Sequence, residues 1–253
     1  MIFALDVGNT NIKCGMFEDS VLIHSFRMAT DIEATSDQFG IRMIDFFRYL
    51  GHVPRDIDGV IISSVIPSIN YTLDHMVREY FEKKPMFVGP GIKTGINIKY
   101  DNPKELGTDR IVNAVGAYEL FGGPVITIDF GTATSFGAIS ENGDFLGGAI
   151  CPGIKITSEA LTINTARLPR IELMRPDKII NKSTVTAMQA GIIYGYVGQV
   201  QYIVGKMKAE MGGAKVVATG GFSELIAAET DCIDEIIPTL TLIGLNKIYM
   251  KNC

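Results

Sequence analysis

The chain has 253 residues, 47% of them hydrophobic and 20% charged, so it can bury one large core or two moderate ones and is not a disordered protein. Its formal net charge of −5 gives no general attraction to a phosphate polymer, and we expect no nucleic-acid partner. The four cysteines form no C-x-x-C pair, which favours reduced thiols in a cytoplasmic protein: Cys14, Cys151, Cys232 and Cys253.

The sequence offers no targeting segment at its start and one stretch that resembles a membrane span. The N-terminal residues lack a basic region followed by a secretory apolar core, so we expect a cytoplasmic location. Residues 184–205 carry no charge and contain Gly191 and Gly195 at the spacing of membrane helix pairs. We nevertheless expect no membrane partner, because a span would bring three primary amides into hydrocarbon: Gln189, Gln199 and Gln201.

The first half predicts three strands, then a helix, a strand, a helix and a strand. Alternating apolar residues indicate a meander of Ile2–Asp6, Asn11–Phe17 and Val21–Met28. A helix from Ser36 to Leu50 follows, with Ser36 as its N-cap and Gly51 at its end. The remaining elements are a buried strand at Gly59–Ser64, a helix that starts after Pro67 and ends at about Phe81, and a short strand at Met86–Val88.

The second half starts in the same way, after a joining helix at Thr108–Phe121. Its three opening strands are Val125–Asp129, Thr134–Ser140 and Phe145–Ile150. Helices are expected after Pro152 and from Ser183 to about Lys208. A strand at Lys215–Thr219, a helix near Ser223 and a closing helix from about Thr241 follow. The repeated order predicts an α/β protein with two βββαβα lobes, residues 1–122 and 123–253.

Each half opens with a strand that ends in Asp-x-Gly. The first such segment contains Gly and short polar side chains whose N–H groups could cradle phosphate, while Asp6 could hold a hydrated magnesium ion and Lys13 could approach phosphate. The same residues are also common in an ordinary hairpin turn. The segment consists of Asp6, Val7, Gly8, Asn9, Thr10, Asn11, Ile12 and Lys13.

The counterpart in the second half is Asp129-Phe130-Gly131-Thr132-Ala133-Thr134. Two such turns across one cleft would surround a triphosphate from both sides, with Thr132 on phosphate oxygens and Asp129 on a cation. The alternative interpretation makes Asp129 a turn acceptor for nearby backbone N–H groups.

A carboxylate and a guanidinium are adjacent at the start of the joining helix. Phosphoryl transfer to an alcohol needs a carboxylate that accepts the hydroxyl proton and a group that fixes the acceptor, and Asp109 and Arg110 could serve these two roles. Asp109 also lies in the first turn of a helix, where a carboxylate stabilises the helix dipole without any catalytic role.

The paired lobes resemble the actin, sugar kinase and Hsp70 superfamily, in which two ribonuclease H-like lobes enclose a central nucleotide cleft. Within it, Gly107-Thr108-Asp109-Arg110 after Tyr100 resembles the substrate signature of type III pantothenate kinases. The resemblance implies ATP with Mg²⁺ at the first turn, and potassium or ammonium at Asp129. It implies Asp109 as the proton acceptor and a pantothenate pocket formed by Tyr100, Gly107, Thr108, Asp109, Arg110 and Thr184.

The function that the resemblance implies is phosphorylation of pantothenate to 4′-phosphopantothenate, the first step of coenzyme A biosynthesis. The alternative is a non-catalytic regulator of the same fold, like the Bvg accessory factor. The helix from Ser183 is apolar on nearly every side and contains four glycines, which predicts close packing and a homodimer through this helix: Gly191, Gly195, Gly198 and Gly205.

Overall fold

The computed structural model describes residues 1–253 and divides into two compact units. Unit 1 comprises Met1–Gly95, Asn102–Glu119 and Leu240–Cys253, and unit 2 comprises Ile96–Asp101 and Leu120–Thr239. The units differ from the predicted lobes because the C-terminal helix packs in unit 1, whereas residues 96–101 add a strand to the sheet of unit 2. That the lobes fold as separate domains stays a prediction.

Unit 1 is built on a five-stranded sheet in the order β3-β2-β1-β4-β5. β1 is the central strand, antiparallel to β2 and parallel to β4, and all six of its residues are buried. The strand bounds agree with the predicted ones to within one residue: β1 (Ile2–Val7), β2 (Asn11–Glu18), β3 (Val21–Ala29), β4 (Gly59–Ser64) and β5 (Met86–Phe87).

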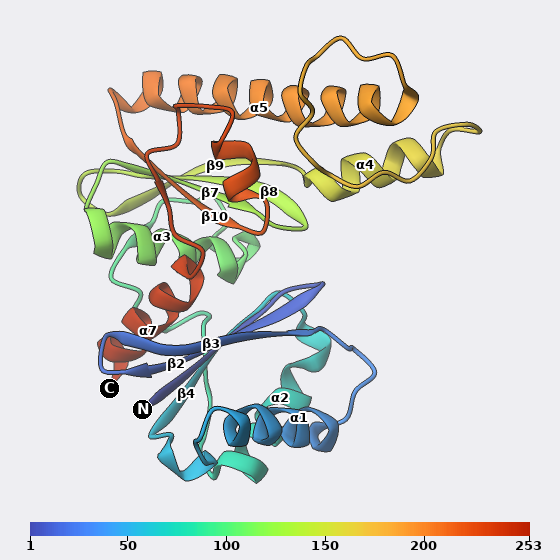
Figure 1. Ribbon diagram of the computed structural model, residues 1–253. Helices are drawn as coiled ribbons and strands as arrows, with labels where there is room; N and C mark the ends of the chain where they lie inside the picture. Colours follow the sequence, from blue (N-terminus) through green and yellow to red (C-terminus); the bar gives the residue numbers. More distant parts are fainter. The chain divides into compact units, whose positions relative to one another are not determined.

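Helices cover both faces of this sheet (Figure 1). α1 (Ser36–Tyr49) and α2 (Asn70–Phe81) pack on the face that carries Phe3, whose ring lies 5.0 Å from that of Phe47 and 5.5 Å from that of Phe81. α7 (Leu240–Asn252) covers the other face, in contact with β1, β2 and β4. α3 (Thr108–Phe121) packs against α7 within the same unit.

The predicted N-cap of α1 was wrong by one residue. Thr35, in an extended conformation, accepts a hydrogen bond from the backbone N–H of Gln38 at 3.3 Å, and the Gln38 side chain accepts one from the Thr35 N–H at 2.8 Å. This reciprocal capping box satisfies two backbone donors at once, which Ser36 followed by Phe39 cannot do. Ser36 is therefore the first helical residue.

Unit 2 repeats the strand arrangement of unit 1. Its sheet has the order β11-β10-β7-β8-β9-β6, and β7 is antiparallel to β8 and parallel to β10, as β1 is to β2 and β4. β6 and β11 contain two residues each and were not predicted, because each is defined by its pairing with β9 or β10 and not by a sequence pattern. The strands are β6 (Asn97–Ile98), β7 (Val125–Phe130), β8 (Ala133–Ile139), β9 (Asp144–Pro152), β10 (Lys215–Gly220) and β11 (Glu235–Ile236).

One long helix, α5 (Thr184–Met211), runs along one face of this sheet with α4 (Ile154–Ile163) beside it (Figure 1). Buried side chains of α5 join those of β7 and β8 in the core of unit 2, among them Ile193, Val197, Val200 and Val204. The short helix α6 (Ser223–Ala227) contacts α5 and β10. Three 3₁₀ turns complete the chain, all in unit 1: Pro54–Asp56, Pro67–Ile69 and Pro103–Glu105.

The chain's own atoms do not pack against the glycines of α5, so the close packing predicted for them stays a prediction that a second copy of the chain would have to supply. A Cβ atom built on Gly191, Gly195, Gly198 or Gly205 would meet no atom within 4 Å. Their spacing of three, four and seven residues places them on one face of the helix, and that face is exposed. None of the helices, α5 included, has the combination of length and apolarity that a membrane span requires.

The contact between α3 and α7 generates a stability prediction. A Cβ on Gly244 would overlap the carbonyl oxygen of Val112, and one on Gly116 would lie 2.7 Å from the Leu240 carbonyl oxygen. Both obstacles are backbone atoms that cannot move aside, so we expect Gly244→Ala to lower the free energy of unfolding by roughly 2 kcal/mol or more.

Urea denaturation followed by circular dichroism measures this change. Gly89→Ala is the matched control, since a Cβ there meets nothing within 4 Å, and we expect a change below about 0.5 kcal/mol. Equal effects of the two substitutions would contradict the close helix contact.

Candidate active site

The two acidic residues predicted for metal binding occupy equivalent positions in the two sheets. Asp6 is the second-to-last residue of β1, opposite Lys13 on β2 and Ser63 on β4. Asp129 is the second-to-last residue of β7, opposite Ser135 on β8 and Thr219 on β10. Each carboxylate thus lies at a strand end beside a tight turn, as the sequence predicted, but a basic residue faces it only in unit 1.

In unit 1 the turn after β1 is held by hydrogen bonds to Thr30. The Gly8 N–H donates to the Asn11 carbonyl at 3.0 Å, while the Thr30 hydroxyl donates to the Gly8 carbonyl at 2.6 Å and its N–H to the Thr10 carbonyl at 3.0 Å. Gly8 is not among the glycines with a left-handed backbone. A Cβ at this position would lie 3.2 Å from the Asn11 oxygen, a tight contact that glycine avoids.

Asp6 and Lys13 contact each other directly. The Lys13 ammonium lies 3.3 Å from the Asp6 carboxylate, and both side chains are largely buried. Burial, followed by the nearby Asp6 charge, raises the pKa of the Cys14 thiol on the same strand, so this cysteine stays protonated. The protonated thiol adds no charge, so the charged groups that β1 and β2 bring to this turn are the Asp6 carboxylate and the Lys13 ammonium.

The start of α3 is attached to the end of β4 that lies beside Asp6. The Thr108 hydroxyl accepts a hydrogen bond from Ser63 at 2.9 Å and donates one to the Ser64 carbonyl at 3.2 Å. Because Ser63 is the register partner of Asp6, unit 1 brings together two motifs that are about a hundred residues apart in sequence. The predicted acceptor signature and the predicted phosphate turn are neighbours in this unit.

Within the signature, Asp109 folds back over Gly107. A Cβ on Gly107 would lie 2.5 Å from the Asp109 Oδ1 atom, and the Gly107 carbonyl accepts the first hydrogen bonds of α3, from Arg110 and Ile111. Arg110 is buried, with 7% of its surface exposed. Glycine at position 107 therefore leaves room for the carboxylate.

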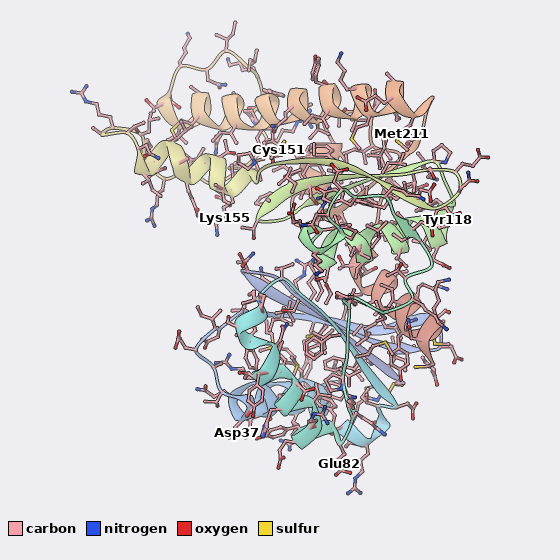
Figure 2. All side chains as sticks on the ribbon, turned by 180° about the vertical axis from the view of Figure 1, so that it is seen from behind. Asp37, Glu82, Tyr118, Cys151, Lys155 and Met211 are labelled. Atoms are coloured by element: carbon pink, nitrogen blue, oxygen red, sulfur yellow. The ribbon has the colours of Figure 1, made fainter.

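In unit 2 the turn after β7 is exposed, but its base is buried. Gly131, Thr132 and Ala133 are exposed, whereas Phe130 and Thr134, which pair across the base, are 1% exposed. The Gly153 N–H donates to the Thr132 carbonyl at 3.1 Å. Gly153 lies at the junction of β9 and α4, between Cys151 and Lys155 (Figure 2).

A tyrosine that the sequence analysis did not select contacts the base of this turn. Tyr196 of α5 donates a hydrogen bond to the Pro152 carbonyl at 2.7 Å and forms a short hydrogen bond with the Thr134 hydroxyl. Its ring lies 6.4 Å from that of Phe130. The available signal was a tyrosine on the buried face of a helix, since a buried phenol usually needs a polar partner.

The remaining predicted residues, Thr184 and Tyr100, lie in different parts of unit 2, Thr184 on α5 and Tyr100 in the segment after β6. Thr184 begins α5 and lines a groove of about 1090 Å³ between α4 and α5, together with Ala160, Leu161, Gly191 and Gly195. Tyr100 is not among the residues that line this groove. Its ring lies 6.4 Å from that of Phe145 on β9.

Solved structures of three other proteins share this fold over nearly the whole chain. A Baf family transcriptional activator from Campylobacter jejuni is 20% identical, with a TM-score of 0.63 over 99% of this chain and 98% of that one. A ROK family glucokinase from Streptomyces griseus, in complex with glucose and AMPPNP, is 13% identical, with a TM-score of 0.52 over 98% and 97%. An inorganic polyphosphate/ATP-glucomannokinase from Arthrobacter is 13% identical, with a TM-score of 0.51 over 99% and 97%.

These likenesses confirm the predicted fold class, that of the actin-like sugar kinases. At such low identity they show the fold alone. The family model of type III pantothenate kinase, in contrast, matches residues 2–206, which include the turns after β1 and β7, the start of α3 and most of α5. The chain therefore belongs to the type III pantothenate kinase family and is an ATP-dependent kinase of that type.

Proposed function

We propose that the protein transfers the γ-phosphoryl group of ATP to the primary alcohol of pantothenate, which gives 4′-phosphopantothenate and ADP, the first step of coenzyme A biosynthesis. The observation that carries the proposal is the attachment of Thr108 to the end of β4. It holds the acceptor signature beside the strand end that carries Asp6.

Asp109 is the proposed general base. As the alcohol oxygen forms its bond to the γ-phosphorus, the bond from phosphorus to the β–γ bridging oxygen breaks and its electron pair leaves with ADP. The hydroxyl proton passes to an Asp109 carboxylate oxygen. Gly107 supports this role, because the absence of a side chain there leaves room for the carboxylate.

The turn after β1 is the proposed phosphate and magnesium site, formed by residues 6–13. No group of three or more His, Cys, Asp or Glu side chains lies close enough to hold a metal ion in an all-protein cage. A single carboxylate, Asp6, fits a Mg²⁺ ion that keeps several waters and binds substrate phosphates, and this ion would neutralise charge on them. Lys13 adds positive charge beside the carboxylate.

The turn after β7 is the proposed second nucleotide contact and monovalent cation site. Thr132 is exposed at its tip and can donate to phosphate oxygens. Asp129 would contribute to binding potassium or ammonium. Its Oδ1 atom lies 3.5 Å from where a Gly131 Cβ would stand, so the carboxylate lies over a turn that has no side chain at that position.

Pantothenate binding is assigned to Tyr100, Thr184 and the residues from Gly107 to Arg110. The guanidinium of Arg110 has the planar donor geometry that pairs with a carboxylate, and pantothenate carries one carboxylate. Thr184 supplies a hydroxyl in a groove whose other walls are largely apolar, which suits an extended acid with a dimethyl branch.

The decisive experiment is an ADP-release assay with pantothenate, pantetheine and glucose as acceptors, run with potassium, ammonium or sodium. We expect turnover with pantothenate in the presence of potassium or ammonium, and a loss of at least about 100-fold in Asp109→Asn, because the proton acceptor is gone. Asp45→Asn is the control, since Asp45 forms an exposed ion pair with Arg48 far along the chain from the signature. Undiminished turnover in Asp109→Asn would contradict the assignment.

The same assay tests the alternative function of a non-catalytic regulator. Its supporting observation is the fold shared with the Baf family activator, at 20% identity. A regulator without chemistry would release no ADP with any acceptor. The net charge of −5 offers such a regulator no general attraction to DNA.

Gly107→Ala tests the position of the Asp109 carboxylate without removing it. The new methyl group would displace Oδ1, which is the movable end of a side chain, so we expect the unfolding midpoint to change little while turnover falls roughly tenfold or more. Steady-state kinetics and thermal unfolding measure the two effects. Turnover equal to that of the wild type would mean that this carboxylate position is not needed.

We also propose that the protein is a homodimer through the exposed face of α5. That face carries four glycines and Tyr202, which is 68% exposed, and has no charged residue between Thr184 and Gly205. We expect sedimentation equilibrium to give about twice the chain mass of 27.6 kDa, and Gly198→Arg to give the single mass, because the charge would be buried without a partner.

The control for the dimer test is Glu210→Arg. Glu210 is exposed on the same helix but lies away from the glycine face, so we expect it to remain dimeric. A wild-type protein that stays at the single chain mass at all concentrations would contradict the dimer.

A further inference from the structure

The turn after β7 forms hydrogen bonds with residues outside the turn. Gly131, Thr132 and Ala133 are exposed and are not part of the core of unit 2, whereas Phe130 and Thr134 at the base of the turn are buried. The equivalent turn in unit 1 is held by the Thr30 hydroxyl on the Gly8 carbonyl. In unit 2 the hydroxyl that contacts the base of the turn belongs to Tyr196 on helix α5.

The direction of each hydrogen bond at this base follows from counting protons. Tyr196 has one hydroxyl proton, and it goes to the Pro152 carbonyl, which can only accept. The Thr134 hydroxyl must therefore donate to the Tyr196 oxygen. Burial raises the pKa of Tyr196, so the phenol keeps its proton at neutral pH. Thr134 therefore donates to Tyr196, and Tyr196 donates to the Pro152 carbonyl.

We propose that Tyr196 is a positioning residue for nucleotide binding, which fixes the Asp129–Thr134 turn through its hydroxyl. The inference rests on the proposed role of this turn in binding ATP. Tyr196 contacts both sides of the turn, the ring of Phe130 on β7 and the hydroxyl of Thr134 on β8. Its bond to Pro152 also ties the turn to the β9–α4 junction, where Gly153 holds the Thr132 carbonyl.

The position of Tyr196 on α5 gives this contact a second consequence. The same residue lines the groove between α4 and α5 that Thr184 also lines. A side chain that contacts the nucleotide turn and borders the groove connects the two binding regions of unit 2 by direct contacts. Loss of the Tyr196 hydroxyl is expected to weaken nucleotide binding through its effect on the turn.

The test compares two tyrosines of one helix. Tyr196→Phe keeps the ring and removes only the hydroxyl, whereas Tyr194→Phe removes a hydroxyl that donates to the Pro176 carbonyl at 3.0 Å, away from the turn. Calorimetric titration with a non-hydrolysable ATP analogue and Mg²⁺ should show roughly tenfold weaker binding for Tyr196→Phe and a change below about twofold for Tyr194→Phe. Unchanged affinity in Tyr196→Phe, or equal losses in both variants, would overturn the proposal.

A double-mutant cycle separates positioning from general loss of structure. Thr134→Val removes the other hydroxyl of the same bond, so Tyr196→Phe combined with Thr134→Val should bind the analogue no more weakly than the weaker single variant. Fully additive losses would contradict a role through this bond. Thr134→Val also provides the test if Tyr196→Phe fails to fold.

Failure of this proposal and failure of the proposed function give different results. The titration contains no acceptor, so a wild-type protein that binds the analogue but leaves pantothenate unphosphorylated removes the acceptor assignment alone. A wild-type protein that phosphorylates pantothenate, together with a Tyr196→Phe variant of normal nucleotide affinity, removes only the role of Tyr196.

Discussion

The central strand of each unit imposes the constraint on which the rest of the site depends. β1 and β7 each have an antiparallel neighbour on one side and a parallel neighbour on the other, so both ladders fix the backbone up to the end of the strand. The backbone of a residue one position before that end cannot shift without breaking hydrogen bonds to two strands, so the point from which the Asp side chain starts is fixed. The turn that follows starts from this fixed point and forms hydrogen bonds with Thr30 in unit 1 and with Tyr196 and Gly153 in unit 2.

In unit 1 the same constraint locates the start of α3. Thr108 bonds to Ser63 and Ser64 at the end of β4, and β4 is registered against β1 residue by residue. Along its middle α3 meets α7, where Gly244 faces the Val112 carbonyl and Gly116 faces the Leu240 carbonyl, and the backbones approach too closely there for any side chain. The helix is thus attached at one end by hydroxyl groups and fitted along its length by close packing, which fixes the residues of its first turn, including Asp109.

The sequence predicted the strands and most helices well because their apolar residues alternate or recur with clear periods, as in Gly59–Ser64, whose bounds agree with the structure. It could not predict that α7 packs in unit 1 or that residues 96–101 extend the other sheet, since both depend on contacts between distant segments. Residues 6–13, Asp109 and Arg110 were predicted for the site from their chemistry, and Gly107 and Thr108 from the resemblance to the family. Tyr196 was missed because it belongs to no motif, and its partners Thr134 and Pro152 lie more than forty residues away.

The central claim is that the first turn of α3 supplies the base for an alcohol acceptor. The most direct measurement is a crystal structure of the protein with pantothenate, Mg²⁺ and a non-hydrolysable ATP analogue. We predict that an Asp109 carboxylate oxygen lies within about 3.2 Å of the primary hydroxyl of pantothenate, which is the reach of a general base. A bound pantothenate whose hydroxyl faces another carboxylate, with Asp109 turned away from it, would contradict the account.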